Sequence, residues 1–134
     1  MNPGVGAAAV VRDGGRVLLV RRSAGQWGAG AWCIPCGFVE WGEDVRTAAA
    51  REAREEAGVD VVIGDVLQVA SNFHELDKPT IGVWFAAELV DRAARPVAGD
   101  DADAVDWFDA GAPPPLAFPT DATLLARLAG DWKR

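Results

Sequence analysis

The chain has 134 residues, which suits one domain over residues 1–134 and leaves little room for a second. Its formal net charge is −7, so it has no electrostatic reason to bind nucleic acid or an anionic membrane, and neither is expected as a partner. The apolar run over residues 5–11 is too short to span a bilayer and lacks the basic start of a signal peptide. A cytoplasmic location is therefore expected.

Hydrophobic patterning and turn residues predict strands first, then a helix, more strands and a final helix. In chain order we expect strands over residues 6–12 and 16–22, a loop over 23–30, a broken strand over 32–39, a helix over 44–57, strand-rich segments over 59–73 and 80–90, a loop over 91–103, a strand over 104–108 and a helix over 121–128. This order predicts an α/β fold with a mixed sheet.

Several residues mark the boundaries of these elements. Asp-Gly-Gly at residues 13–15 indicates a hairpin, and Asp-Lys-Pro at residues 77–79 indicates a second turn. Asp44 suits the start of the first helix, and Gly58 suits a left-handed residue after its end. The closing helix has either Thr120 or Asp121 as its cap. Three prolines at residues 113–115 form a stiff connector before it.

The two cysteines, Cys33 and Cys36, have the spacing of a redox pair or of half a zinc site. The sequence contains no second pair of cysteines at this spacing and no nearby histidine to complete a zinc site. Pro35 lies between the cysteines, and a strand rather than a helix is expected here. We therefore interpret them as two reduced thiols in a tight strand and loop.

The first helix carries three glutamates beside its apolar stripe. The residues of the stripe are Val45, Ala49, Ala53 and Ala57. Glu52, Glu55 and Glu56 are three or four residues apart, so like charges come within reach of one another and destabilise the helix. Arg51, placed to pair with Glu55, would offset this repulsion, as would divalent cations, which prefer carboxylate oxygens. Taken alone, such a helix is more often a solvated surface.

The spacing of fixed residues around this helix changes the interpretation. The segment over residues 37–59 reads GFVEWGEDVRTAAAREAREEAGV. It has the fixed residues of a known pattern at the required spacing, namely Gly37, Glu43, Arg51, Glu52, Glu55, Glu56 and Gly58. The chain thereby resembles the Nudix hydrolase family, and the preceding segment resembles the strand and loop that lead into this box. Many members have Pro-Gly-Gly where this chain has Pro35, Cys36 and Gly37.

The resemblance implies a Nudix fold, in which a mixed sheet is sandwiched between helices, and a bound Mg²⁺ or Mn²⁺. Glu52, Glu55 and Glu56 would bind the metal, with the backbone oxygen near Gly37 as a further ligand. Arg51 would orient a glutamate by ion pairing. Glu43 would brace the loop or hold water at the metal. Glu55 or Glu52 would be the general base, although in some members a loop outside the box supplies it.

Residues outside the box are implied in substrate and metal binding. Among the acidic residues before the last strand, Asp101 is the favoured metal ligand, and a solvated acidic loop is an equal alternative. Arg21 and Arg22 end the second strand, where similar proteins place an arginine that contacts phosphate. The alternative is a surface charge at the end of a strand. Trp27 is a candidate for stacking on a nucleobase or for simple packing.

Three further side chains receive simpler interpretations. Trp32 and Phe118, like Trp27, either stack on a base or pack within the protein. His74 is interpreted as a surface or loop residue rather than as a base or ligand. The glycines Gly37 and Gly58 are expected where a Cβ atom would clash and where backbone shape requires glycine.

The reaction implied is metal-dependent hydrolysis of the diphosphate linkage in a nucleoside diphosphate joined to another group. ADP-ribose or a nucleotide sugar is favoured, because segments 34–44 and 99–109 look most like bacterial ADP-ribose pyrophosphatases. One alternative is a pyrophosphohydrolase of nucleoside triphosphates. Another is a non-catalytic sensor module with the Nudix fold. The partner is a small nucleotide, and relatives are frequently homodimers.

Overall fold

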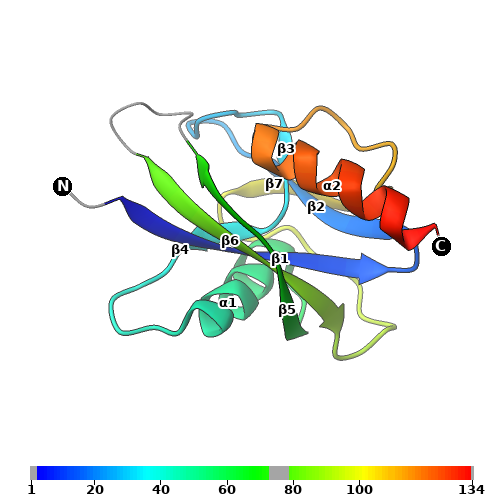
Figure 1. Ribbon diagram of the computed structural model, residues 1–134, viewed down its shortest axis with the longest axis horizontal. Coiled ribbons are helices and arrows are strands. Elements are labelled where there is room, and N and C mark those ends of the chain that lie inside the picture. Colours follow the sequence, from blue (N-terminus) through cyan, green and yellow to red (C-terminus); the bar gives the residue numbers. More distant parts are fainter. Residues whose placement is uncertain (1–2, 73–78, 134) are drawn as a thin grey trace.

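The computed structural model describes residues 3–72 and 79–133, which form seven strands and two helices (Figure 1). The elements in chain order are β1 (Gly4–Asp13), β2 (Arg16–Arg22), β3 (Trp32–Cys33), β4 (Cys36–Phe38), α1 (Val45–Ala57), β5 (Val61–Asn72), β6 (Thr80–Leu89), β7 (Ala102–Asp109) and α2 (Pro119–Trp132). The predicted order of elements is confirmed. His74 lies outside the described residues, and so do residues 77 and 78 of the predicted turn over residues 77–79.

The strands form one mixed sheet in the order β3-β2-β1-β6-β5. The central pair, β1 and β6, is parallel over Gly4 to Val11, and the other pairs are antiparallel. Off this path, β4 pairs with β1 and β7 pairs with β2. The predicted mixed sheet is thus present. Its branches bring Cys36 of β4 and the segment before β7 toward the C-terminal end of α1.

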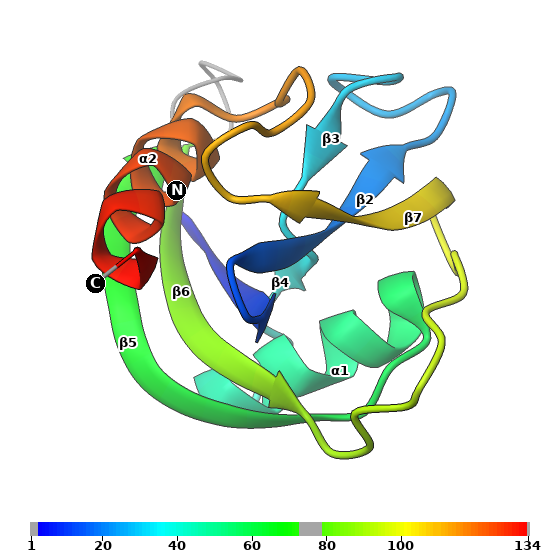
Figure 2. The same ribbon diagram turned by 90° about the vertical axis from the view of Figure 1, so that its right-hand side faces the viewer.

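Two helices cover opposite faces of the central strands (Figure 2). Alternate residues of β1 point to opposite sides: Ala7, Ala9 and Val11 pack toward α1, whereas Ala8 and Val10 pack toward α2. Since both faces are buried, β1 is a continuous apolar run rather than an alternating one. The predicted three-layer arrangement of helix, sheet and helix is confirmed.

The hairpin and the broken strand form as their turn residues predict. β1 and β2 pair antiparallel up to Asp13 and Arg16, and Gly14 has a φ of +63°, which favours glycine. The segment over residues 32–39 divides into β3, which pairs with β2, and β4, which pairs with β1. Pro35 lies at the break, because it has no N–H to donate to a neighbouring strand.

Both predicted caps of α1 are confirmed. The Asp44 side chain accepts a hydrogen bond from the backbone N–H of Arg46 at 3.0 Å, and Gly58 adopts the left-handed conformation with a φ of +68°. The alanine stripe is buried against β1 because the small side chains allow close packing. Glu52 is also buried, at the edge of this stripe.

The predictions for α2 and β7 were wrong at their ends. The helix α2 begins at Pro119, which suits a first helical turn because proline needs no hydrogen-bond partner there, and it extends to Trp132. Its N-cap is Phe118, without a side-chain hydrogen bond, so neither Thr120 nor Asp121 is the cap. β7 begins at Ala102, two residues before the predicted start.

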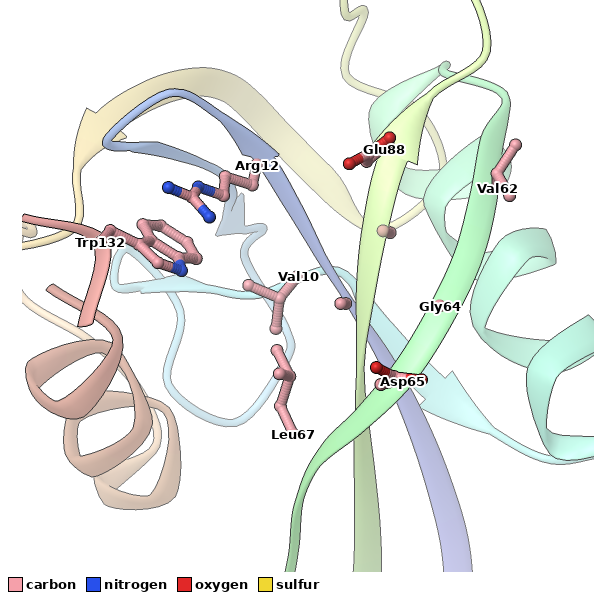
Figure 3. Close-up of a pocket in the computed structure, with 10 residues that line it drawn as sticks. Val10, Arg12, Val62, Gly64, Asp65, Leu67, Glu88 and Trp132 are labelled. Atoms are coloured by element: carbon pink, nitrogen blue, oxygen red, sulfur yellow. The ribbon is translucent and has the colours of Figure 1, made fainter. Parts of the chain in front are cut away.

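A cavity of about 400 Å³ lies between the end of α2 and the sheet (Figure 3). Its walls include Arg12 and Trp132 on one side and Asp65 and Glu88 on the other. Arg12 lies over the Trp132 ring, with its Cζ atom 4.4 Å from the ring centroid. This cavity is on the α2 side of the sheet, whereas the glutamates of α1 lie on the other side. Within residues 3–72 and 79–133, neither helix is long and apolar enough to cross a bilayer.

Candidate active site

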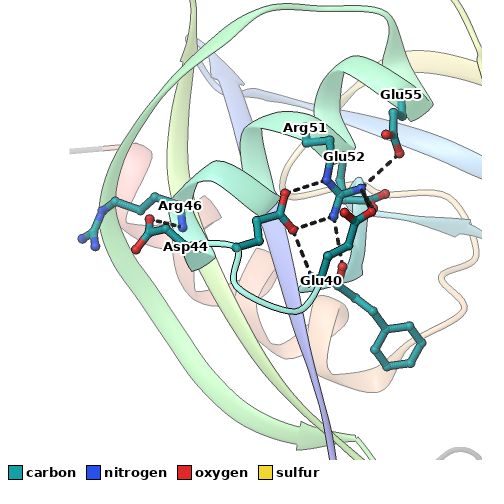
Figure 4. Close-up of polar contacts among 8 residues, drawn as sticks. Glu40, Asp44, Arg46, Arg51, Glu52 and Glu55 are labelled. Carbon is teal, nitrogen blue, oxygen red and sulfur yellow. Dashed lines mark hydrogen bonds and ion pairs between the residues drawn. The ribbon is translucent and has the colours of Figure 1, made fainter.

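The side chain of Arg51, on α1, is the centre of a polar network (Figure 4). Its Nε and Nη2 atoms donate to the two carboxylate oxygens of Glu43 at 2.7 and 2.9 Å. Its Nη1 atom donates to Glu52 at 2.8 Å and to Glu55 at 3.2 Å. Nη2 also donates to the backbone oxygen of Phe38 at 3.1 Å. The expected pair of Arg51 and Glu55 is therefore present, within a network that fixes the guanidinium on several sides.

Glu43 braces the loop that leads into α1. Its Oε1 atom accepts a hydrogen bond from the backbone N–H of Glu40 at 3.0 Å, while Arg51 holds both of its oxygens. The hydrogen bonds from Arg51, and then the one from Glu40, lower the pKa of Glu43 to about 2. The same contact raises the pKa of Arg51 above its ordinary value. Both groups are therefore charged at neutral pH, and the geometry agrees with the bracing role that the resemblance implied.

Glu52 packs against Gly37, and this contact explains the glycine. The Glu52 side chain is only 12% exposed. A Cβ atom at position 37 would lie 2.2 Å from the Glu52 Cδ atom, closer than any stable contact. Gly37 has no positive φ, so it is required for space; Gly58, by contrast, is required for backbone conformation. Burial raises the pKa of Glu52, and the hydrogen bond from Arg51 opposes this shift.

Glu56 is the most strongly perturbed carboxyl group of α1. Its Oε1 atom accepts a hydrogen bond from the backbone N–H of Cys36 at 2.8 Å. Burial raises the pKa of Glu56 to about 8, although this hydrogen bond and the charge of Arg22 act in the opposite direction. The negative charges of Glu52 and Asp101 raise the pKa further. These four groups therefore lie close enough to Glu56 to influence its ionisation.

The three glutamates of α1 differ in their surroundings. Glu52 and Glu56 lie at the edge of the buried face, whereas Glu55 is 43% exposed and contacts Arg51. In residues 3–72 and 79–133, no three Asp, Glu, His or Cys side chains are close enough together to form a ready metal site. The narrow arc predicted from the helical wheel is therefore occupied by Glu52 and Glu56, with Glu55 at its solvent side.

These residues nevertheless fit a hard divalent cation such as Mg²⁺ or Mn²⁺. Carboxylate oxygens are the ligands that such ions prefer. The Oε2 atom of Glu56 receives no hydrogen bond from any described residue, and the half-buried group has a raised pKa. A cation beside Glu56 would stabilise its ionised form and offset the repulsion from Glu52. Glu52, Glu55, Glu56 and Asp101 are the side chains that would hold it.

Arg21 and Arg22 point to different surroundings. Arg21 forms an ion pair with Asp103, with 2.6 Å between Nε and Oδ1. Arg22 donates from Nε to the backbone oxygen of Trp27 at 2.6 Å and lies over the Phe118 ring at 4.9 Å from its centroid. Its charge also lowers the pKa of Glu56. Arg22 is therefore the arginine on the side of the glutamates.

The aromatic residues near this region pack against one another. Trp27 stacks on Phe118 with ring centroids 5.6 Å apart and an interplanar angle of 13°. Trp32 contacts Phe108 edge to face at 4.8 Å. Of the two interpretations given to Trp27, Trp32 and Phe118, packing is the one present in this conformation.

Asp101 is brought next to α1, and its backbone is unusual. Its φ is +60°, in the left-handed region that residues other than glycine seldom adopt. Its backbone oxygen accepts a hydrogen bond from the N–H of Ser23 at 3.2 Å. Strained backbone of this kind is concentrated at functional sites. The position of Asp101 thus supports its selection among the acidic residues of this loop.

Sequence reasoning missed the role of Asp121, which it treated as a helix cap. This carboxylate is buried and accepts hydrogen bonds from the indole N–H of Trp84 at 2.8 Å and from the backbone N–H of Ile34 at 3.1 Å. Burial raises the pKa of Asp121 to about 6. These bonds tie α2 to Ile34, which lies just before β4. Cys36 of β4 in turn donates its backbone N–H to Glu56. The only sequence signal of Asp121 is its helical spacing from Leu124, Leu125 and Leu128, which places it on the apolar face of α2.

Both cysteines are free in the structure. Cys33 is buried, and Arg22 Nη1 lies 3.9 Å from its Sγ atom. A hydrogen bond with Cys33, together with burial, raises the pKa of Cys36 well above its ordinary value. A raised pKa disfavours the reactive thiolate.

Comparison with known proteins identifies relatives of this chain. Residues 2–128 match the family model described as NUDIX domain. An ADP-ribose pyrophosphatase from Methanocaldococcus jannaschii is 30% identical over 119 residues, which cover 88% of this chain and 69% of that protein. A CTP pyrophosphohydrolase from Escherichia coli is 39% identical over 69 residues, which cover 52% of this chain and 50% of that protein.

Solved structures show the same likeness in three dimensions. The crystal structure of a NUDIX hydrolase from Nitrosomonas europaea superposes with a TM-score of 0.85 and 28% sequence identity. The superposition covers 98% of this chain and 72% of that one. Because the family model matches nearly the whole chain, and Glu43, Arg51, Glu52 and Glu55 of its box form one hydrogen-bonded network, this protein belongs to the Nudix hydrolase family.

Proposed function

We propose that this protein uses Mg²⁺ or Mn²⁺ to hydrolyse the diphosphate linkage of ADP-ribose or of a nucleotide sugar. Nudix hydrolases generally use divalent metal ions. The single observation that carries the proposal is the position of Glu56, which lies beside the buried Glu52 with one carboxyl oxygen bonded to the N–H of Cys36 and the other without a hydrogen bond from any described residue. Neighbouring carboxyl groups with raised pKa values, such as Glu52 and Glu56, are concentrated at functional sites, and a bound cation would stabilise their ionised forms.

Each residue of the network has a separate task in this reaction. Divalent cations, when bound, would neutralise charge on the diphosphate and lower the pKa of the attacking water. Arg51 and Glu43 hold the helix and the preceding loop in one arrangement, and Gly37 gives the Glu52 carboxylate its space. Cys36 orients Glu56 through its backbone N–H.

Glu55 is the best candidate for the general base. It is more exposed than Glu52, whose carboxylate is packed against Gly37 and bonded to Arg51. An exposed carboxylate with one ion pair can accept a proton from water without leaving a buried charge. The substrate is anionic and the protein is acidic, so a cation at the mouth of the site is needed to bind it. Arg22 is the candidate for this task, since its charge acts on Glu56.

The relatives support two substrate classes. The relative that covers most of this chain is named as an ADP-ribose pyrophosphatase, which favours a nucleoside diphosphate joined to a sugar. The Escherichia coli relative is named as a CTP pyrophosphohydrolase and supports a nucleoside triphosphate as the second candidate. The products distinguish them. The first class yields a nucleoside monophosphate and a sugar phosphate, and the second yields a nucleoside monophosphate and pyrophosphate.

The proposal is tested by incubating the purified protein with ADP-ribose, nucleotide sugars and nucleoside triphosphates, with Mg²⁺, with Mn²⁺ or with EDTA. We expect cleavage of ADP-ribose or a nucleotide sugar that EDTA abolishes. In the Glu55→Gln variant, kcat should fall by about a hundredfold or more, because Gln cannot accept a proton. Glu88→Gln, in the cavity on the other side of the sheet, is the control and should retain activity.

Three outcomes would change the assignment. Pyrophosphate release from triphosphates alone would favour the second substrate class. Binding of these compounds without any product would favour a sensor module. Full activity of Glu55→Gln would show that the base is another residue, for which Asp101 is the next candidate.

A further inference from the structure

The last turn of α1 is held by a segment that comes forty residues later in the chain. The last four carbonyl groups of a helix lack partners within the helix. In α1 the first of these, on Arg54, accepts a hydrogen bond from the N–H of Gly58 at 3.1 Å. The other three accept hydrogen bonds from the segment over residues 97–101, which lies just before β7. All four carbonyl groups are therefore satisfied.

Three backbone N–H groups of this segment make these bonds. Val97 donates to Ala57 at 2.9 Å, Gly99 donates to Glu56 at 3.0 Å, and Asp100 donates to Glu55 at 3.0 Å. Two of the acceptors are thus the backbone oxygens of the residues that carry the site's carboxylates. Figure 2 shows the chain between β6 and β7 passing the end of α1 from which β5 continues.

Gly99 makes this close approach possible. A Cβ atom at position 99 would lie 2.0 Å from the backbone oxygen of Glu55, and this oxygen cannot swing aside as the end of a side chain can. Gly58 faces the same segment, because its own Cβ would lie 2.8 Å from the backbone oxygen of Val97. Residues at both positions must therefore lack a side chain if the helix end and the segment are to remain in contact.

The segment also connects α1 to the arginine side of the site. Ala102 donates to the oxygen of Gly99 at 3.2 Å, and the oxygen of Asp101 accepts from Ser23 at 3.2 Å. These bonds enclose Asp101 and hold its left-handed conformation. Ser23 follows Arg22 directly. The segment thus joins Glu55, Glu56 and Asp101 to the strand end that carries Arg22.

We propose that Gly99 is a positioning residue for catalysis, through which the segment over residues 97–101 holds the last turn of α1, with Glu55 and Glu56, against the loop that carries Asp101. This proposal rests on the proposed function. An alanine at position 99 separates the segment from the helix and breaks the bonds to Glu55 and Glu56. A displacement of about 1 Å is enough to lower a catalytic rate about a hundredfold.

The test compares Gly99→Ala with two controls on α2. Gly130→Ala introduces the same methyl group where no atom lies within 4 Å, and Leu128→Ala destabilises the core far from the site. We expect Gly99→Ala to lower kcat by about 10- to 100-fold with KM changed less than about threefold, and to raise the half-saturating Mg²⁺ concentration. Each variant is assayed at a temperature where circular dichroism shows it to be folded.

The controls separate positioning from stability. Leu128→Ala should lower the melting temperature by roughly 5–15 °C and keep the wild-type kcat. Gly130→Ala should also keep the wild-type kcat and should not lower the melting temperature, because alanine favours a helix more than glycine does. The proposal is overturned if folded Gly99→Ala keeps the wild-type kcat, or if Leu128→Ala loses as much kcat for the same loss of melting temperature.

Two further measurements decide the remaining cases. If the wild-type protein cleaves no nucleotide, the proposed function fails, and Mn²⁺ affinity by calorimetry then tests the positioning. Gly99→Ala should bind Mn²⁺ about tenfold more weakly than Leu128→Ala, and equal affinity overturns the proposal.

If Gly99→Ala does not fold, amide hydrogen exchange of the wild-type protein decides. The N–H groups of Val97, Gly99 and Asp100 should be protected as strongly as those of α1, and free exchange overturns the proposal.

Discussion

Replacing Glu56 by glutamine is expected to stabilise the metal-free protein at neutral and alkaline pH while removing its activity. Glu56 is half-buried, and its Oε1 atom accepts a hydrogen bond from the N–H of Cys36 at 2.8 Å. A glutamine oxygen can accept the same hydrogen bond, and the amide has nearly the same shape as a protonated carboxyl group. The substitution therefore removes the ionisation of Glu56 and leaves the packing in place.

The magnitude follows from the pKa. Burial raises the pKa of Glu56 from 4.5 to about 8 in the folded state. Between these two values the folded protein keeps a proton that the unfolded chain releases, so the free energy of unfolding falls as pH rises. The full contribution is present below pH 4.5 and is lost as pH rises through about 8. At about 1.4 kcal/mol for each pH unit, the loss between pH 4.5 and pH 7 is roughly 3 kcal/mol.

The assay is urea unfolding in EDTA at pH values from 5 to 8.5, for wild type and Glu56→Gln. Burial also raises the pKa values of Glu52 and Asp121, so both proteins should lose stability with rising pH. The difference between the two proteins isolates Glu56. It should grow in favour of Glu56→Gln by about 1 kcal/mol or more for each unit between pH 5 and pH 8. Glu55→Gln, at an exposed position, is the matched control and should follow wild type.

Magnesium provides the second half of this test. A cation stabilises the ionised form of Glu56, so Mg²⁺ should raise the melting temperature of wild type more at pH 8 than at pH 6. Glu56→Gln should gain much less. Identical pH profiles for wild type and Glu56→Gln in EDTA would refute the reasoning, because they would mean that Glu56 is not desolvated in the folded protein.

Three other substitutions test the rest of the network. Arg51→Lys keeps the charge but loses the two-pronged contact with Glu43, so kcat/KM should fall about 10- to 100-fold in steady-state assays; a change under twofold would contradict the positioning role. Gly37→Ala should displace Glu52 and lower kcat at least about tenfold, whereas Gly15→Ala, where no atom lies within 4 Å, should leave kcat unchanged. Asp101→Gly should keep the melting temperature within roughly 3 °C of wild type, because relief of the positive φ offsets the flexibility of glycine, yet lower kcat; an unchanged kcat would identify the loop as merely solvated.

Elements whose signals lie within a few neighbouring residues were predictable from the sequence. The hairpin at Gly14 and the two ends of α1 follow from local turn and cap chemistry, and the structure confirms them. The pattern of the box also identified Arg51 and its glutamates, since residues three or four apart on a helix are neighbours. The closing helix was predicted less well, because a proline at a first turn and a glycine inside a helix give conflicting local signals.

Contacts between distant segments were decided only by the tertiary structure. Cys36 and Glu56 are 20 residues apart, and Ile34 and Asp121 are 87 residues apart, yet hydrogen bonds join each pair. The different surroundings of Arg21 and Arg22, and the need for glycine at position 99, likewise depend on which strands meet in the sheet. The sequence by itself determines which residue types lie along one helix and how far apart they are. The burial that raises a pKa, and the space that excludes a Cβ atom, are properties of neighbours that only folding brings together.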